Sequence, residues 1–130
     1  MIKALIVDQA DDDSVSASIH EIEASQLPDD GEVDIAVEYS TINYKDGLCL
    51  NGLGRLVRNY PHVPGIDLAG TVISSRANGI AAGDRVTMNG FRSGEIRWGG
   101  YATRANGKAE WIVKLPNGMS TVSYTHLTLP

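Results

Sequence analysis

Cysteine is nearly absent from this chain: among its 130 residues, Cys49 is the only one. One cysteine can form neither an intrachain disulfide nor a multi-cysteine zinc site. Runs of Lys or Arg are also absent, and 11 basic against 16 acidic residues give a formal net charge of -5. Because phosphate groups are bound by clustered cations, this balance argues against nucleic acid and against a membrane surface as partners.

Long apolar runs are missing as well. No stretch approaches the roughly 20 apolar residues that a membrane-spanning helix needs. The first residues, MIKALIVDQADDD, are a short apolar run followed by acids. They lack the basic region and the long apolar region of a secretory signal peptide. We therefore expect a cytoplasmic protein.

A third absence concerns dinucleotide binding. The chain contains no G-x-G-x-x-G turn between a strand and a helix, which a dinucleotide fold needs to bring pyrophosphate to a helix N-terminus. The glycines at positions 52, 54, 90, 94, 99 and 100 are turn residues, and none follows a strand and opens a helix. The sequence therefore predicts that the Rossmann type of domain is not part of this chain.

The pattern of apolar residues that is present indicates about seven short strands. We expect them at residues 2–7, 14–23, 33–43, 65–75, 85–89, 99–106 and 110–116. The clearest is 33–43, where Val33, Ile35, Val37 and Tyr39 fall on one face, whereas 14–23 reads as a half-buried strand. Gly70 inside a strand suggests a bulge or a close backbone approach.

One short helix is expected after Asn43, which can cap it. It should run for at most two turns within residues 44–52, broken by Gly47 and Gly52. An apolar share of 42% and a length of 130 residues suit one domain with a single core. Many short strands, one short helix and closely spaced turns predict a mainly β fold, either a sandwich or a partly open barrel.

Four segments carry a family resemblance: NYKD (43–46), PGIDLAGTV (64–72), AGDRV (82–86) and RWGGYA (97–102). In this order and spacing the chain resembles the medium-chain dehydrogenase/reductase superfamily. Within it, the chain resembles the acrylyl-CoA reductase branch (YhdH/AcuI type, often labelled quinone oxidoreductase-like). The resemblance runs from about Ile2 to Met119. It implies a GroES-like, partly open β-barrel with one or two short helices, which a Rossmann domain follows in the family.

The resemblance also implies domain boundaries. Residues 1–121 would be the GroES-like N-terminal catalytic domain, and the active-site cleft would lie between it and a Rossmann domain that this chain lacks. Residues 122–130 do not continue the family pattern and look like translated read-through of a sequencing adapter. We expect that tail to be non-native, and His126 within it to have no function.

The positions at which zinc-dependent relatives bind the metal carry other residues in this chain. Zinc-dependent relatives carry cysteine where Asn43 stands, and Gly-His-Glu where Gly65, Ile66 and Asp67 stand. A catalytic zinc site needs about three protein ligands, and an isoleucine coordinates nothing. We therefore expect no metal and a zinc-independent reaction. The other possible ligands show no ligand spacing: His20, His62 and Cys49.

Without zinc to polarise a carbonyl, the resemblance implies reduction of an enoyl thioester with NADPH. Hydride goes to the β-carbon, and the enolate that results needs hydrogen-bond donors and a proton. Tyr44 is a catalytic candidate: the resemblance implies that its hydroxyl lies near the nicotinamide ribose, where it would hold the cofactor and donate or relay a proton. The alternative is that Tyr44 simply packs with its hydroxyl satisfied.

Three further candidates are the two residues beside Tyr44 and Asp67, which stands where relatives carry an acid. Asn43 would contact the cofactor or merely cap the helix. Lys45 would face a cofactor phosphate or be a solvated surface lysine. Asp67 would hydrogen-bond into the active site as a catalytic residue or anchor a backbone turn.

Substrate-binding candidates lie further along the chain. Arg55 and Arg58 stand on a loop, and arginine matches the phosphates of a CoA thioester with a planar fork. Exposed loop arginines are the alternative. Trp98 would wall the substrate pocket or close the end of the barrel.

The functional hypothesis is therefore NADPH-dependent reduction of acrylyl-CoA, or a similar small enoyl-CoA, by the full-length protein. The resemblance implies a homodimer at full length and an inactive isolated chain, because most NADPH contacts would belong to the absent domain. Two alternatives stay open. One is a quinone or enone reductase of the same superfamily, and the other is a self-standing GroES-like binding module without enzymatic activity.

Overall fold

The computed structural model describes residues 1–90, 93–116 and 118–120, so the predicted tail and His126 lie outside the described residues. The strands are β1 (Ile2–Gln9), β2 (Val15–Ile22), β3 (Val33–Ser40), β4 (Asp67–Ser75), β5 (Arg85–Asn89), β6 (Arg104–Gly107) and β7 (Ile112–Lys114). The helices are η1 (Ala24–Gln26), α1 (Tyr44–Leu50) and η2 (Ala109–Trp111). No helix within these ranges is long and apolar enough to cross a membrane.

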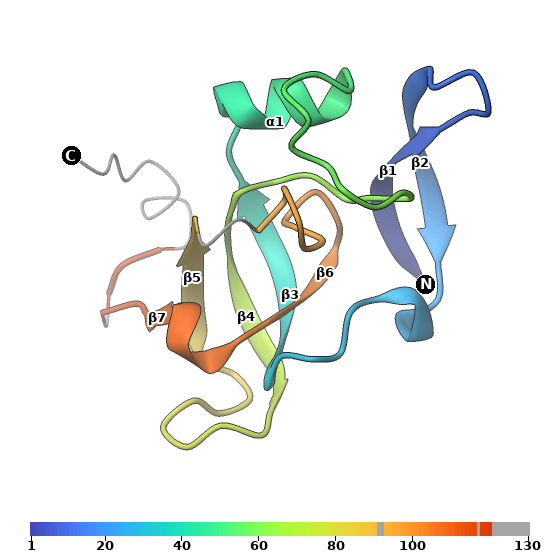
Figure 1. Ribbon diagram of the computed structural model, residues 1–130. Helices are drawn as coiled ribbons and strands as arrows, with labels where there is room; N and C mark the ends of the chain where they lie inside the picture. The colour runs from blue at the N-terminus through green and yellow to red at the C-terminus, as the bar shows by residue number, and fades with distance from the viewer. Residues whose placement is uncertain (91–92, 117, 121–130) are drawn as a thin grey trace.

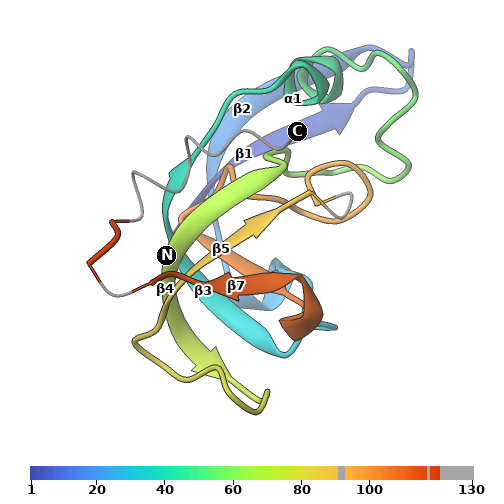
Figure 2. The same ribbon diagram turned by 90° about the vertical axis from the view of Figure 1, so that its left-hand side faces the viewer.

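The strands form two antiparallel sheets. β1 and β2 make a hairpin in which Ile2 faces Ile22 and Gln9 faces Val15. The other sheet has five strands in the order β6-β3-β4-β5-β7. Figure 1 shows the hairpin standing beside the larger sheet, with α1 above the larger sheet, and Figure 2 shows the curvature of that sheet. Because the two sheets do not close on each other, the predicted mainly β, partly open architecture is confirmed.

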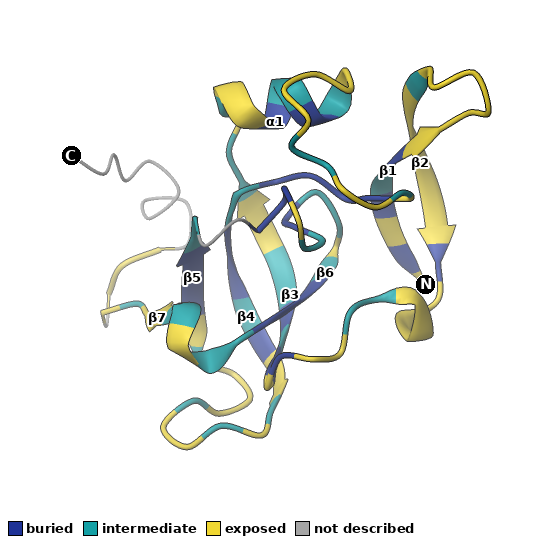
Figure 3. Ribbon diagram, viewed as in Figure 1, coloured by how far each residue is buried: buried dark blue, intermediate teal, exposed yellow. Residues whose placement is uncertain are grey.

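The main core lies on the inner face of the larger sheet. β3, β4 and β5 contribute most of it, and these strands carry the dark blue of buried residues in Figure 3. The buried members are Val33, Ile35, Leu68, Val72, Val86, Met88 and Ala105. The strict alternation predicted along β3 holds through Ile35. It is wrong for Tyr39, which is 45% exposed, because the pairing with β4 shifts register between Val37 and Tyr39.

The prediction that residues 14–23 form a half-buried strand is right about the strand and wrong about burial. Along β2 only Ile22 is buried, Val15 is intermediate, and Ile19 is 73% exposed. Within the described part of the chain, β2 is hydrogen-bonded to β1 alone. Because β2 is an edge strand of a two-stranded sheet, no further sheet is required to pack on its outer face, and most of its side chains stay exposed.

The hairpin is attached to the rest of the domain through β1. The Leu5 N–H donates to the Tyr101 carbonyl (2.8 Å), and Val7 and His62 exchange two backbone hydrogen bonds of 2.8 and 2.9 Å. A second, smaller hydrophobic core packs against β1 and β2. Its buried members are Ile2, Ala4, Ile22 and Val63. The predicted strand at 99–106 is shorter than expected, starting at Arg104, because residues before it make these separate contacts.

Two loops meet at close range beneath α1. The Gly99 N–H donates to the Val63 carbonyl (2.7 Å), and the Gly100 N–H donates to the Gly65 carbonyl (2.8 Å). A Cβ atom at Gly94 would lie 2.6 Å from the backbone of Gly65, and one at Gly99 would overlap the Gly65 carbonyl oxygen. Because both contacts are backbone against backbone, neither loop can retreat from an added side chain. We call this contact between residues 63–67 and 93–101 the glycine contact.

Gly70 makes the close approach that its place in a strand suggested. A Cβ atom there would overlap the Ala36 carbonyl oxygen on β3. Gly47, in contrast, was predicted to break the helix, and α1 runs through it to Leu50. Nothing lies within 4 Å of a Cβ atom placed on Gly47.

These two glycines give opposite predictions for alanine. Gly70→Ala should lower the free energy of unfolding by more than about 2 kcal/mol, because it overpacks a central strand pair. Gly47→Ala should raise it by roughly 0.5–1 kcal/mol, since alanine loses less backbone entropy in a helix. Urea denaturation of both variants measures the difference. Equal effects of one sign would contradict the close approach at Gly70.

Candidate active site

The candidate site forms where the N-terminus of α1 meets the start of β4. Asn43 has extended backbone angles (φ -121°, ψ 163°) and is the N-cap of α1, as predicted. Its N–H donates to Asp46 Oδ2 (3.0 Å), three residues on. This is the capping-box spacing, which satisfies backbone donors that a helix start leaves open.

Asp46 is fully buried, with 0% exposure. Its Oδ1 accepts from the N–H groups of Gly65 (3.2 Å) and Ile66 (3.0 Å), the two residues that precede β4. Its Oδ2 faces Asn43. The carboxylate therefore ties α1 to the start of β4.

Asn43 and Asp67, which the sequence marked as separate candidates, are in contact. Asp67 Oδ2 accepts from Asn43 Nδ2 (3.2 Å) and from Thr41 Oγ1 (3.1 Å). Asn43 Nδ2 also donates to Thr41 Oγ1 (2.9 Å) and approaches Asp46 Oδ2 (3.4 Å). Since a carboxylate only accepts hydrogen bonds, these partners fix which edge of the amide faces inward. The result is a compact polar cluster of Thr41, Asn43, Asp46 and Asp67.

Tyr44 projects away from this cluster. It is 83% exposed, and the preceding Ile42 is 90% exposed. The alternative in which Tyr44 packs inside the domain is therefore wrong for the described residues. The hydroxyl of Tyr44 is free to reach a molecule bound at the end of α1.

Lys45 points to another side of α1. Its Nζ lies 3.0 Å from Glu95 Oε1, and Glu95 is almost fully buried while Lys45 is more than half exposed. Lys45 is thus neither a lone surface lysine nor a free cation. Its first electrostatic partner is a carboxylate of this domain.

The substrate-binding candidates do not join the cluster. Arg55 and Arg58 are exposed on the loop after α1. Trp98 donates from Nε1 to the Pro61 carbonyl (3.2 Å) and packs against the small core under the hairpin. Neither of its two predicted roles is tested by these contacts, and both stay predictions.

Two further polar side chains are buried near α1: Cys49 on the helix itself and His62 on the loop before β4. The Gly94 carbonyl lies 2.6 Å from His62 Nε2 and 3.4 Å from Cys49 Sγ, which donates to it. Burial raises the pKa of Cys49 to about 11, and the negative charges of Asp46 and Glu95 act in the same direction. Burial lowers the pKa of His62, although its bond to Gly94 opposes the shift. At neutral pH both groups are uncharged, so Cys49 is not an activated nucleophile.

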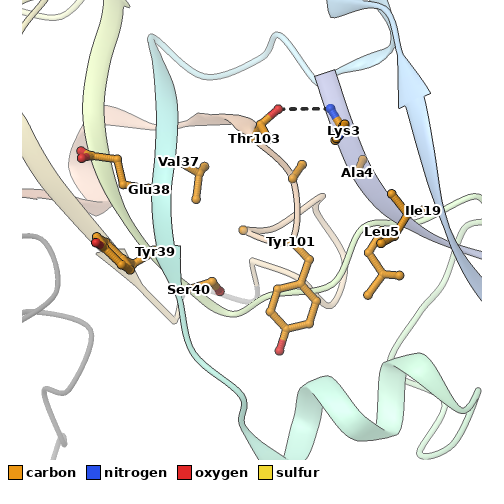
Figure 4. A pocket seen from close by; sticks show the side chains of 12 residues that line it. Lys3, Ala4, Leu5, Ile19, Val37, Glu38, Tyr39, Ser40, Tyr101 and Thr103 are labelled. Carbon is orange, nitrogen blue, oxygen red and sulfur yellow. Dashed lines mark hydrogen bonds between the residues drawn. The ribbon is translucent and has the colours of Figure 1, made fainter. Parts of the chain in front are cut away.

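A pocket of about 390 Å³ opens between β1, β2, β3 and residues 100–103 (Figure 4). Two of its lining residues touch the polar cluster from behind. Ser40 Oγ donates to the Asp67 carbonyl (2.6 Å), and the Tyr101 hydroxyl donates to the Thr41 carbonyl (2.9 Å). Burial raises the pKa of Tyr101, and the charges of Asp46 and Asp67 add to the shift. None of the residues predicted for the site lines this pocket.

Sequence reasoning missed three members of this region. Asp46 had a local signal, because Asn43-x-x-Asp46 is a capping-box pattern. Thr41 and Tyr101 had none: Thr41 joins the cluster through Asp67, 26 residues away, and Tyr101 through Thr41, 60 residues away. No group of three or more His, Cys, Asp or Glu side chains that could hold a metal occurs among residues 1–90, 93–116 and 118–120.

With this geometry established, comparison with known proteins gives the class. Residues 29–117 match the alcohol dehydrogenase GroES-like domain, and the chain belongs to that family. The chain is also similar to proteins that bear the names acrylyl-CoA reductase and YhdH oxidoreductase.

Acrylyl-CoA reductase AcuI of Ruegeria pomeroyi is 50% identical over 122 residues, which are 93% of this chain and 37% of that protein. A Bacillus subtilis relative whose name includes quinone oxidoreductase YhfP is 44% identical over 108 residues, 83% of this chain and 32% of the relative. The crystal structure of the YhdH oxidoreductase of Salmonella enterica in complex with NADP matches with a TM-score of 0.90 and 43% identity. That match covers 95% of this chain and 37% of the other. The chain therefore spans about a third of the length of these relatives.

The buried His62 should make folding stability depend on pH. Its folded pKa lies below the ordinary value of 6.5, so between the two values the unfolded chain binds more protons. Stability should then rise with pH across that window and fall as the pH drops below about 6.5. His62→Gln should show a shallower loss between pH 8 and pH 5, measured as free energy of unfolding. Identical slopes for the two proteins would contradict the burial of a neutral histidine.

Proposed function

We propose that this chain is the substrate-side domain of a zinc-independent, NADPH-dependent reductase. The full-length protein would reduce the C=C bond of acrylyl-CoA or a similar small enoyl-CoA. The observation that carries the proposal is the exposed side chain of Tyr44, which directly follows Asn43 at the end of α1, where Asn43 and Asp67 are hydrogen-bonded. The relatives that bear the name acrylyl-CoA reductase support the choice of acceptor.

The reaction needs a hydride, a hydrogen-bond donor to the thioester oxygen and a proton. NADPH, when bound, supplies the hydride, which goes to the β-carbon of the enoyl thioester. The electron pair of the C=C bond moves to the thioester, and the enolate that forms takes a proton at the α-carbon. Donors placed where the negative charge develops lower the barrier.

Tyr44 is the group of this site best suited to donate. The amide of Asn43 is already engaged with Thr41 and Asp67 through Nδ2. The Tyr44 hydroxyl has no hydrogen-bond partner among the described residues and reaches outward. It therefore suits a contact to the nicotinamide ribose, a proton donation or a proton relay.

NADPH would be held mainly outside this chain. No described glycine turn leads from a strand into a helix N-terminus, and Lys45 already pairs with Glu95. The fit is limited to Tyr44 and its immediate neighbours, so we expect no measurable NADPH binding by the isolated chain. The cytoplasmic location and the homodimer stay predictions from the sequence.

The acceptor is tested with the full-length gene product. NADPH oxidation is followed with acrylyl-CoA and, separately, with a simple quinone at equal concentration. A higher kcat/KM for acrylyl-CoA is the expected result. A clear preference for the quinone would favour the quinone reductase alternative, to which the name of the Bacillus subtilis relative points.

Removing one hydroxyl tests Tyr44. In the full-length protein Tyr44→Phe should lower kcat/KM by about 100-fold, the usual effect of losing a positioned proton donor. Tyr39→Phe is the comparison, because Tyr39 is 45% exposed and lies on β3, where it lines the pocket but makes no contact with the polar cluster. If the two variants keep equal activity, Tyr44 has no catalytic part.

Zinc independence is tested directly on the full-length enzyme. Metal analysis should find no stoichiometric zinc, and a chelator should leave the rate unchanged, because Asn43 and Ile66 stand where zinc-dependent members of the superfamily would place ligands. Dialysis without chelator is the control. Loss of activity that added zinc restores would refute this part of the proposal.

A further inference from the structure

We propose that Asp46 is a positioning residue: its carboxylate sets the relation between Asn43 and Asp67, and so the geometry of the polar cluster. Asp46 does not face the exposed side where Tyr44 projects. It touches neither substrate nor cofactor in the proposed function. Its effect on the reaction would therefore act through its neighbours.

The burial of Asp46 is the first argument. A fully buried carboxylate is costly unless both oxygens are hydrogen-bonded. Here Oδ1 accepts from the N–H groups of Gly65 and Ile66 (3.2 and 3.0 Å). Oδ2 accepts from the Asn43 N–H at 3.0 Å. One rigid planar group thus joins two segments that are about twenty residues apart in the chain.

The position of its partners is the second argument. Ile66 directly precedes Asp67, so holding the Gly65 and Ile66 N–H groups fixes the direction in which Asp67 enters β4. On the other side, Asn43 Nδ2 lies 3.4 Å from Asp46 Oδ2 and 3.2 Å from Asp67 Oδ2. The amide is therefore bracketed by two acceptors, which turn its NH2 edge inward.

The opposite flank of the same segment is the third argument. The Gly65 carbonyl accepts from Gly100 (2.8 Å) and the Pro64 carbonyl from Tyr101 (3.0 Å), through the glycine contact. That flank is backbone against backbone and cannot adjust. The flank toward α1 is held by the Asp46 side chain. A substitution of Asp46 therefore changes the site without breaking the hydrogen bonds of a sheet.

Asp46→Asn in the full-length protein is the first test. It replaces one acceptor oxygen by an NH2 group, which would face a backbone N–H. Displacements of about 1 Å at a catalytic site cost up to 100-fold in rate, so we expect kcat to fall at least tenfold. The KM for NADPH should change less than twofold, because most cofactor contacts would lie outside this domain.

Asp84→Asn is the matched control. Asp84 Oδ2 also accepts a backbone N–H, that of Ala81 (2.9 Å), and pairs with Lys114 (3.3 Å), but in a turn between β4 and β5. This variant should lower the melting temperature and leave kcat unchanged. If Asp46→Asn and Asp84→Asn lose stability alike and both keep wild-type kcat, the proposal is wrong.

Hydrogen exchange gives a readout that is independent of the acceptor. In Asp46→Asn, peptides covering residues 63–68 should exchange faster, while those covering β5 should not. A uniform increase over all peptides would overturn the proposal. The kcat measurements rest on the proposed function. A wild-type protein that is inactive with both acrylyl-CoA and quinone would refute that function. Hydrogen exchange would still decide whether Asp46 positions residues 63–68.

Asp46→Glu covers the case in which the asparagine variant does not fold. Glutamate keeps the charge and both acceptors but moves them by one methylene. We expect a folded protein whose kcat is at least tenfold lower. Wild-type kcat in this variant, or loss of folding in both variants, would assign Asp46 a structural role alone and overturn the proposal.

Discussion

The glycine contact is the constraint on which the other features depend. Residues 63–67 and 93–101 approach so closely that side chains at Gly94 or Gly99 would overlap backbone atoms. From one side of this contact β4 begins, and with it Asp67. From the other side Tyr101 continues to β1 and carries the hairpin. A single backbone-to-backbone contact thus sets the place of the hairpin, the larger sheet and the polar cluster.

The fold was predictable wherever a strand has one face on the core. Val33 and Ile35 alternate with polar neighbours, and that pattern led to β3 directly. The predicted alternation is wrong at Tyr39, where the pairing with β4 shifts register. No residue pattern in the sequence indicates such a shift. The prediction also failed for burial on β2, because whether an edge strand is covered depends on distant segments.

The sequence indicated several residues of the candidate site, but it did not predict which of them are in contact. Asn43 and Asp67 were both singled out, yet their direct contact depends on how residues 24 positions apart meet. Asp46 was within reach of sequence reasoning through its capping-box spacing. The loop arginines Arg55 and Arg58 illustrate the limit in the other direction: residue chemistry suited a phosphate, but the loop places them outside the cluster.

The protected thiol of Cys49 has a practical consequence. A side chain with no solvent exposure and a pKa of about 11 reacts slowly with maleimides near neutral pH. A cysteine introduced at the highly exposed position of Ile42 would then be the sole rapidly labelled site of the chain. Fluorophores or spin labels can be attached two residues from Tyr44 without first removing the native thiol, and ligand approach to this end of α1 becomes directly observable.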